Sequence, residues 1–218
     1  SDIIRKKPQP ILIEAKTFRI RGHEEASGVK YVPKKLIDKW KKDDFGVVQE
    51  MLETIKLTTL KEINCTEDIP ESSHTIEGNA IQKVNYLTQY YSADGFADDT
   101  GLEIEALNGE PGVYSARYAG EVATYEDNCK KMLKEMKRFS KNERTAHFRT
   151  VIAFVTDHEK IWTEGIVKGT ILDHQNGDKG FGYDAIFYYP PLEKTFAAMK
   201  KDEKNSISHR GKALRNFS

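Results

Sequence analysis

Patterns typical of strands and of helices alternate along the chain, and the strand patterns at its centre lie close together. Residues 148–156 are rich in β-branched and aromatic side chains, and residues 161–171 follow with a second strand pattern. Interspersed helices and closely spaced central strands predict an α/β or α+β fold with a mixed sheet. The same spacing argues against an all-parallel, doubly wound sheet.

Several further elements are expected from periodicity and capping residues. Thr75 is placed to cap a helix that runs to Gln89, and Thr124 and Asp127 have the spacing of a capping box. Ser208 is placed to cap a terminal helix over residues 209–217. The other predicted strands are 11–20, 57–60, 102–107 and 183–188, and a bulge at Gly165 is expected within the strand 161–171. Helical stripes are predicted within 34–44 and 48–55.

Charge excludes some classes of partner. The chain has 218 residues with 34 basic and 34 acidic side chains, so its formal net charge is zero. A neutral chain lacks the global positive field of a protein that binds nucleic acid or anionic membranes, so neither is expected as a partner. No apolar run approaches the roughly 18 residues that a membrane-spanning helix needs. The first eight residues lack the apolar core of a secretory signal peptide. Cys65 and Cys129 form no disulfide framework or zinc pattern, which favours a cytoplasmic setting.

The neutral total is the sum of two unlike parts. Residues 1–46 contain 12 basic and 7 acidic side chains, a net of +5, whereas residues 47–218 contain 22 and 27, a net of −5. We therefore divide the chain into an atypical N-terminal segment, 1–46, and a main domain, 47–218.

Two adjacent carboxylates are the first candidate for chemistry. Asp98 and Asp99 follow a strand-like stretch and precede Thr100. Neighbours in a straight strand point to opposite faces, but at a strand end both can address one ion or one water. Hard oxygen ligands of this kind suit Mg²⁺. The alternative is an exposed acidic turn. Glu77 is a lesser candidate, and its alternative is an acid that favours a helix N-terminus.

Three other segments carry candidate ligand-binding residues. Ser115 and Arg117, in a stretch of small residues, can contact phosphate, and the alternative is a compact turn. Phe181 lies between two glycines that leave a ring face open for stacking, beside Asp184. The alternative is a turn with a packed aromatic ring. A final donor-rich segment contains Lys204, His209 and Arg210 near a predicted helix N-terminus, where the alternative is a solvated basic patch.

Together, these segments resemble the inosine triphosphate pyrophosphatase family, which hydrolyses non-canonical purine nucleoside triphosphates. The resemblance rests on ADDTGLE at residues 97–103, LNG followed by PGVYSARYAG at 107–120, FGYD at 181–184, and KN followed by SHR at 204–210. It implies an elongated mixed sheet with flanking helices, two lobes around a nucleotide cleft, and a homodimer. It also implies hydrolysis of ITP, dITP and XTP to the monophosphate and pyrophosphate, with Mg²⁺ as cofactor.

The resemblance assigns roles by position. Asp99 would be the general base or a Mg²⁺ ligand, and Asp98 would assist with metal or water. The metal set is then Asp98, Asp99 and Glu77. Phe181 would stack on the purine, and Lys204, His209 and Arg210 would read its 6-oxo edge. Donors at that edge reject the amino group of adenine, whereas rejection of guanine would depend on its 2-amino group. The predicted substrate-binding residues are Thr100, Ser115, Arg117, Phe181, Gly182, Tyr183, Asp184, Lys204, His209 and Arg210.

Two departures from the family pattern concern phosphate and metal binding. Members often carry EEN where this chain has EGN, which leaves Glu77 as the one carboxylate there. The family's T-x-N-x-x-K triphosphate loop falls on residues 39–44, where Lys39, Lys41 and Lys42 are candidate replacements and Asp44 would repel phosphate. In this reading, residues 11–20 supply an edge strand.

These departures leave alternatives open. The favoured hypothesis is an active pyrophosphatase. A second hypothesis is a purine-nucleotide-binding protein or a weakened hydrolase that has lost the triphosphate loop. A third makes residues 1–46 an interaction module, and a fourth is a pyrophosphatase with a different base preference, such as a modified pyrimidine.

Overall fold

The structure is a computed structural model that describes residues 11–14, 57–92, 95–155 and 160–217. The predicted helical stripes at 34–44 and 48–55, and the candidate phosphate loop with Lys39, Lys41, Lys42 and Asp44, lie outside these residues. So does most of the predicted segment 1–46. None of the helices in the described part has the length and apolar character needed to cross a bilayer.

A mixed sheet forms the body of the molecule, as predicted. Its strand order is β2-β1-β3-β5-β6-β7-β8, with β4 paired to β3. Strand β1 is parallel to both of its neighbours, and the other pairs are antiparallel. The strands are β1 (Ile11–Glu14), β2 (Leu57–Thr58), β3 (Gly95–Ile104), β4 (Pro111–Gly112), β5 (Thr145–Val155), β6 (Lys160–Ile171), β7 (Phe187–Tyr189) and β8 (Lys194–Thr195).

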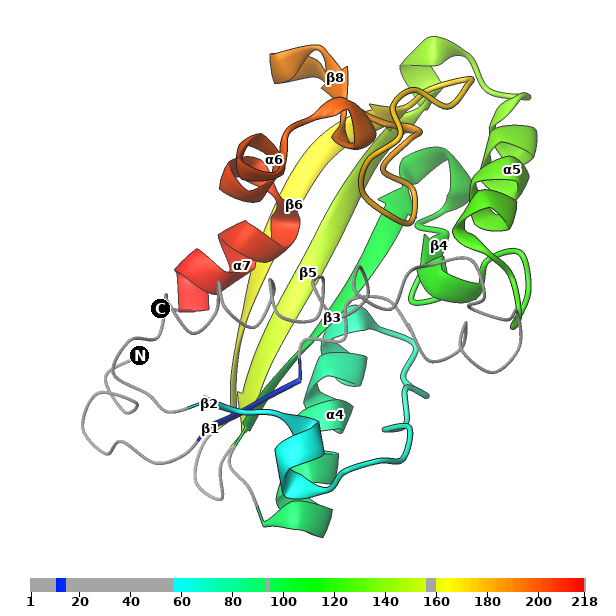
Figure 1. Cartoon of the computed structure of the whole chain (residues 1–218). Helices are drawn as coiled ribbons and strands as arrows, with labels where there is room; N and C mark the ends of the chain where they lie inside the picture. The colour runs from blue at the N-terminus through cyan, green and yellow to red at the C-terminus, as the bar shows by residue number, and fades with distance from the viewer. Residues whose placement is uncertain (1–10, 15–56, 93–94, 156–159, 218) are drawn as a thin grey trace.

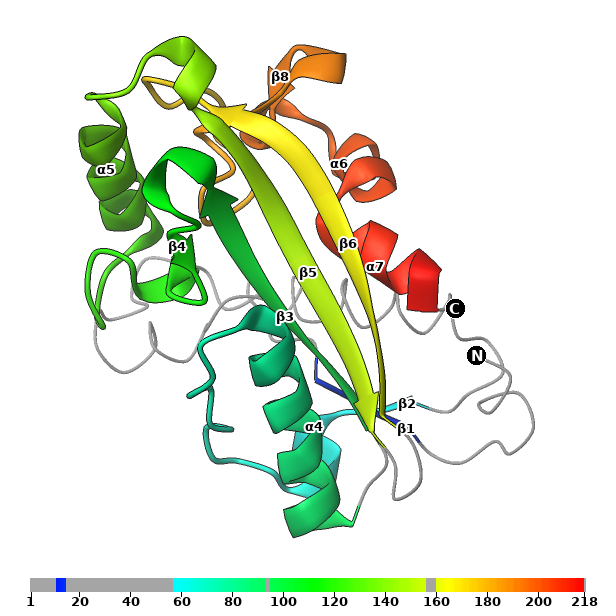
Figure 2. The ribbon, with the colours of Figure 1, turned by 180° about the vertical axis from the view of Figure 1, so that it is seen from behind.

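The long strands β3, β5 and β6 run side by side through the molecule, with α4 near one end and α5 at the other (Figures 1 and 2). Helix α7 packs on β6 and β5, whereas α4 packs on β3 and β5. The four α-helices of the described residues are α4 (Ile76–Tyr91), α5 (Tyr125–Met136), α6 (Lys201–Ile207) and α7 (His209–Phe217).

The predicted helix starts are confirmed by their caps. The Thr75 hydroxyl accepts a hydrogen bond from the Gly78 backbone N–H at 3.0 Å, and α4 begins at the next residue. Thr124 and Asp127 form the reciprocal capping box that opens α5. A capping side chain satisfies a backbone N–H that the helix itself leaves unpaired, so these short motifs mark helix starts locally.

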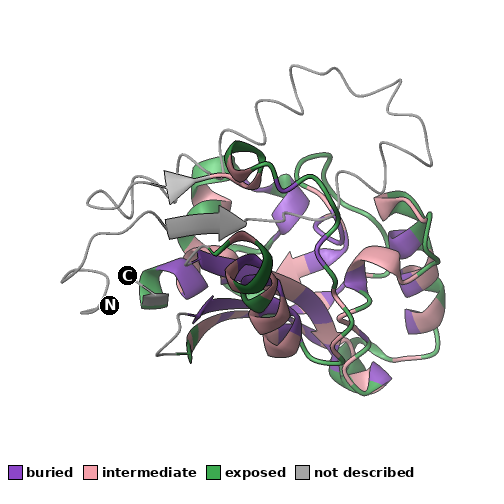
Figure 3. Cartoon of the chain, turned by 90° about the horizontal axis from the view of Figure 1, so that it is seen from below, coloured by how far each residue is buried: buried purple, intermediate pink, exposed green. Residues whose placement is uncertain are grey.

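Two apolar cores lie at opposite ends of the long strands. Near one end, Ile76, Ala80 and Val84 of α4 pack with Val151 and Ala153 of β5. Near the other end, α5 packs against strands β3, β5 and β7 and the segment after β8. The residues in contact include Cys129, Met132, Met136, Leu102, Phe148, Phe187 and Phe196. Figure 3 shows buried residues concentrated on the central strands and on the inner sides of the helices.

Some strand boundaries differ from expectation. The predicted strand 183–188 is only Phe187–Tyr189, because Gly182 adopts a left-handed conformation with φ of 60° and turns the chain. Tyr183 is instead buried, with its hydroxyl donating to the Ser115 carbonyl at 2.9 Å. The described strand within 11–20 is β1, which is not an edge strand because β2 lies outside it.

Gly165 does not form the predicted bulge. It pairs with Thr150 in a register that continues without interruption on both sides. A Cβ atom at this position would lie 2.1 Å from the His209 carbonyl oxygen and 2.4 Å from the Ala213 backbone nitrogen. Glycine is therefore needed here because the α7 backbone approaches the strand closely.

We expect Gly165→Ala to lower the free energy of unfolding by about 1–3 kcal/mol, because α7 must move away from the sheet. Urea denaturation of both proteins measures the difference. The matched control is Lys168→Gln, an exposed residue of the same strand, which should change stability by less than about 0.5 kcal/mol. Equal stability of wild type and Gly165→Ala would contradict the packing argument.

Candidate active site

Asp98 and Asp99 lie in the middle of β3 and not at a strand end as expected. Their side chains therefore take opposite faces, Asp98 toward α7 and Asp99 toward α4. Strand β1 pairs with residues 95–97 of β3, and β4 pairs with residues 102 and 103. In the described part of the chain, no strand pairs with residues 98–101 on that side. We call this stretch, which is unpaired among the described residues, the free edge of β3.

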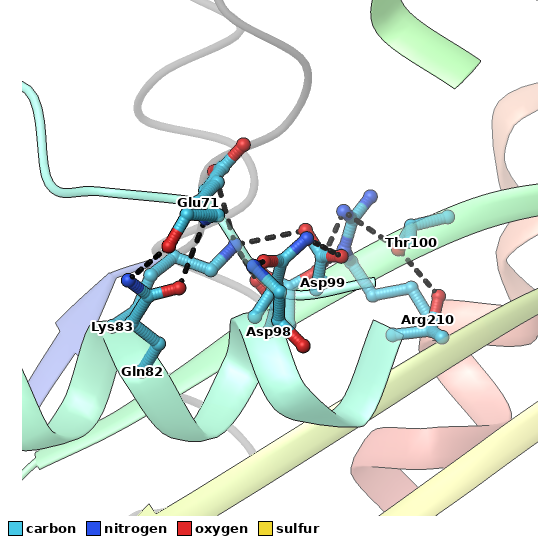
Figure 4. Close-up of polar contacts among 11 residues, drawn as sticks. Glu71, Gln82, Lys83, Asp98, Asp99, Thr100 and Arg210 are labelled. Carbon is cyan, nitrogen blue, oxygen red and sulfur yellow. Dashed lines mark hydrogen bonds and ion pairs between the residues drawn. The ribbon is translucent and has the colours of Figure 1, made fainter. Parts of the chain in front are cut away.

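On the α4 face, four side chains form what we call the acidic cluster: Glu71, Asn79, Lys83 and Asp99. Figure 4 labels three of them, Glu71, Lys83 and Asp99. The Lys83 Nζ atom donates to Asp99 Oδ1 at 3.0 Å, to Glu71 Oε1 at 3.3 Å and to the Asp98 carbonyl at 2.6 Å. The Asn79 amide donates to Asp99 Oδ2 at 3.3 Å. Two side chains of α4 therefore hold the two oxygens of the Asp99 carboxylate, and the loop before α4 contributes through Glu71 and its contact with Lys83.

Burial and charge act on this cluster together. Only 1% of the Lys83 side chain is exposed. Burial opposes its positive charge, but the carboxylates of Asp99, Glu71 and Asp98 outweigh burial and raise the pKa of Lys83. Burial also raises the pKa of Asp99, although Lys83 opposes that shift. A carboxylate whose pKa is raised is a stronger base when ionised, which suits proton abstraction from water.

Glu71, Asn79 and Lys83 were not identified from the sequence. One signal was available for Lys83, which falls within the apolar stripe of α4 beside Ala80, Val84 and Leu87. A charged residue on a buried helix face requires a partner of opposite charge. Glu71 lies in a loop without periodicity, and no local pattern marks it.

The acidic cluster fits a magnesium ion. Glu71 and Asp99 are carboxylates from different segments that both contact one ammonium group. Mg²⁺ in proteins commonly takes one or two carboxylates and completes its coordination with water and substrate phosphate. Within the described ranges, no group of three or more His, Cys, Asp or Glu side chains forms a ready-made metal site.

Asp98 and Glu77, the other predicted metal ligands, are each held by an arginine. Arg210 donates to Asp98 Oδ2 from Nε at 3.0 Å and from Nη2 at 2.7 Å. Arg149 donates to Glu77 at 3.1 Å and to Glu164 at 2.8 Å. Their role as ligands stays a prediction.

On the α7 face, a small pocket brings together most of the predicted substrate-binding residues. Its lining comes from β3, β5, the loop before β7 and the start of α7. The lining residues are Thr100, Phe148, Phe181, Gly182, Tyr183, Asp184, His209 and Arg210. We call this hollow the α7 pocket.

Phe181 in the α7 pocket is positioned by an ion pair. The buried Asp184 carboxylate accepts hydrogen bonds from the Phe181 backbone N–H at 2.8 Å and from Lys204 Nζ. The Lys204 ammonium lies 4.6 Å from the centre of the Phe181 ring. A side chain on Gly180 would collide with Asp184, since a Cβ there would lie 2.0 Å from Oδ2. The glycine before Phe181 thus allows the carboxylate to approach.

His209 is 7% exposed and its ring stacks on Phe148, with centroids 4.9 Å apart. Burial lowers the pKa of His209 well below its usual value, and the positive charges of Arg210 and Lys204 lower it further. The imidazole is therefore neutral near pH 7 and provides one ring N–H.

Comparison with known proteins identifies the family. Residues 34–218 match the model of the Ham1 family. The chain belongs to the Ham1 family. A Flavobacterium johnsoniae protein named dITP/XTP pyrophosphatase is 51% identical over 174 residues, covering 79% of this chain and 90% of that protein. A Flavobacterium psychrophilum protein of the same name is 52% identical over 169 residues, covering 77% and 88%.

Solved structures of Ham1 proteins share the fold. The Staphylococcus aureus Ham1 protein has a TM-score of 0.77 and 35% identity, and the match covers 96% of each chain. A Coxiella burnetii HAM1 protein has a TM-score of 0.76 and 37% identity, over 80% of this chain and 91% of that one. The Ham1 family model begins at residue 34, upstream of the boundary predicted at residue 47.

Three predicted ligand-binding residues of this Ham1 family member lie outside the lining of the α7 pocket: Ser115, Arg117 and Lys204. Lys204 contacts two of the lining residues, Asp184 and Phe181. The Ser115 hydroxyl donates to the Gly112 carbonyl at 2.6 Å and accepts from the Leu102 N–H at 2.9 Å. Arg117 pairs with Glu121 at 3.6 Å. Through these two hydrogen bonds, Ser115 holds the segment after β4 against β3. Phosphate contact by Ser115 or Arg117 stays a prediction.

We expect Lys83→Met to lower the free energy of unfolding by about 3–5 kcal/mol at pH 7, because it leaves buried carboxylates without a counter-charge. Without Lys83, the pKa of Asp99 rises further. A carboxylate whose folded pKa is raised costs stability above its unfolded pKa, so the deficit should shrink as the pH falls toward 4. Urea denaturation without metal across this pH range tests the prediction.

The matched control is Lys130→Met, which removes an exposed ion pair with Glu126 and should change stability by about 1 kcal/mol or less. A Lys83→Met protein that is as stable as the control at pH 7 would show that the acidic cluster does not depend on this ammonium.

Proposed function

We propose that this protein hydrolyses non-canonical purine nucleoside triphosphates (ITP, dITP and XTP) to the monophosphate and pyrophosphate. One observation carries the proposal: Asp99 of the acidic cluster and Thr100 of the α7 pocket are consecutive residues at the free edge of β3. A nucleotide that crosses this edge would have its base in the pocket and its phosphates beside Asp99. The names of the Flavobacterium relatives support the same substrate class.

The acidic cluster supplies the hydrolytic chemistry in this proposal. Asp99 accepts a proton from a water molecule while the oxygen of that water attacks the α-phosphorus. The bond between the α-phosphorus and the oxygen that bridges to the β-phosphorus breaks, and pyrophosphate leaves. Glu71 and Asp99 are the residues that would hold Mg²⁺, which neutralises phosphate charge when bound. Lys83 keeps both carboxylates in place through the contacts described above.

The α7 pocket selects the base. Phe181 offers an aromatic face for the purine, and Lys204, His209 and Arg210 provide hydrogen-bond donors. A 6-oxo group accepts from these donors, whereas the 6-amino group of adenine presents a donor of its own. A buried donor left without an acceptor costs enough to discriminate by orders of magnitude.

The proposal extends to assembly and setting. We propose a homodimer, as the family resemblance implies, and a reducing cytoplasmic environment. Cys65 and Cys129 are both buried thiols, which suits a compartment where thiols stay reduced.

Incubation with ITP and Mg²⁺ should yield IMP and pyrophosphate, measured by chromatography and a pyrophosphate assay. Asp99→Asn should lower kcat/KM by about a hundredfold or more, because the amide cannot accept the proton. The matched control is Asp173→Asn, an exposed aspartate that pairs with His174, and it should retain the wild-type rate. Tight IMP binding without any turnover would overturn the proposal in favour of a purine-nucleotide-binding protein.

Variants of two glutamates distinguish between the two candidate metal sites. We expect Glu71→Gln to raise the Mg²⁺ concentration for half-maximal rate by about tenfold or more, since it removes a carboxylate of the acidic cluster. Glu77→Gln should change it little, because that carboxylate pairs with Arg149 and lies outside the acidic cluster. Magnesium titrations of the two variants at saturating ITP measure both values, and the reverse order would assign the metal to Glu77.

A further inference from the structure

Three polar contacts in a row link Arg210, Thr100, Thr150 and His209 across the α7 face of the sheet. Thr100 and Thr150 are paired in register across β3 and β5, and their Oγ1 atoms lie 2.7 Å apart. Thr150 Oγ1 lies 2.6 Å from His209 Nδ1. Arg210 Nη2 approaches Thr100 Oγ1 at 3.5 Å from the other end. Thr150 is fully buried and is not among the residues that line the α7 pocket.

The direction of these hydrogen bonds follows from counting protons. Each threonine hydroxyl has one proton to donate, and arginine can only donate. If Thr100 donates to Thr150 and Thr150 donates to His209 Nδ1, both hydroxyl protons have an acceptor. In the opposite direction, the half-buried Thr100 hydroxyl would have no protein acceptor among the described residues, because Arg210 beside it can only donate.

This direction determines which ring nitrogen of His209 is protonated. Because the buried imidazole is neutral, it has one N–H. When Nδ1 accepts from Thr150, the proton must be on Nε2. No residue in the described part of the chain forms a hydrogen bond with Nε2, and His209 lines the α7 pocket. Nε2 is therefore the ring atom left to bind a ligand, and it is a donor.

We propose that Thr150 is a positioning residue that fixes the tautomer of His209, so that Nε2–H is presented as a donor and 6-oxo purines are favoured over 6-amino purines. The selectivity in this inference rests on the proposed function, whereas the tautomer does not. Thr150 acts only through His209, since its own hydroxyl is used by Thr100 and His209.

Removing the hydroxyl should release this constraint. In Thr150→Val, His209 Nδ1 loses its donor, so the ring can place its proton on either nitrogen. The second tautomer has a bare Nε2 that accepts a hydrogen bond from an amino group at C6 of adenine. The preference for inosine over adenosine nucleotides should then fall by on the order of tenfold. Thr150→Ser retains the hydroxyl and should retain the wild-type preference.

Ring ¹⁵N NMR of the unligated full chain measures the tautomer directly. Wild type and Thr150→Ser should show His209 protonated at Nε2 and bare at Nδ1, whereas Thr150→Val should show a mixture or the reverse. A matched control is Thr163→Val, because Thr163 also donates to α7, but to the Ala213 carbonyl at 3.1 Å. That variant should leave the His209 signals unchanged. Thr150→Ala serves as a second test if valine prevents folding.

Selectivity is measured as the ratio of kcat/KM for ITP to that for ATP, and as the ratio of IMP to AMP affinity by calorimetry. Wild-type His209 protonated at Nδ1, or signals unchanged in both Thr150→Val and Thr150→Ala, would overturn the inference. A changed tautomer with unchanged ratios would overturn its specificity role. If wild type hydrolyses no ITP, the proposed function fails, while the NMR and the affinity ratios still decide the role of Thr150.

Discussion

The ammonium group of Lys83, on α4, contacts two other parts of the chain at once. It contacts the loop before α4 through Glu71, and it contacts β3 through Asp99 and the Asp98 carbonyl. Since this ammonium is almost completely buried, its charge can be kept only while these partners stay in place. The apolar core places α4 on the sheet, and the geometry of the acidic cluster depends on this one ammonium group.

The free edge of β3 explains how one strand serves two different kinds of chemistry. Alternation along a strand separates Asp98 and Thr100 from Asp99, so the groups proposed for hydrolysis and those proposed for base binding lie on different faces. A continuous sheet would keep these faces apart. Because β1 stops at residue 97 of β3 and β4 begins at residue 102, no described strand pairs with residues 98–101 on this side, and the proposed nucleotide would cross β3 there. Short flanking strands are thus as important for the site as the residues on β3.

Local patterns predicted the helix starts at Thr75, Thr124 and Ser208, the mixed sheet, and most residues of the α7 pocket, because caps and short motifs carry their information within a few residues. The acidic cluster was only partly predictable, since Glu71 lies in a loop and contacts Asp99 only indirectly, through a lysine on another element. The pair of Asp98 with Arg210 spans 112 positions, and no local rule relates such distant residues. The role of Gly165 depends on how closely α7 approaches β6, which is a property of the packed structure.

The cations around the α7 pocket are each matched by a carboxylate, Arg210 by Asp98 and Lys204 by Asp184. The pocket therefore offers directed N–H groups without a surplus of positive charge, and the imidazole between them is neutral. A triphosphate tail gains little Coulombic energy by entering such a hollow. In the proposed function, charge pairing thus disfavours a nucleotide bound in the reverse orientation, with its phosphates in the α7 pocket in place of the base.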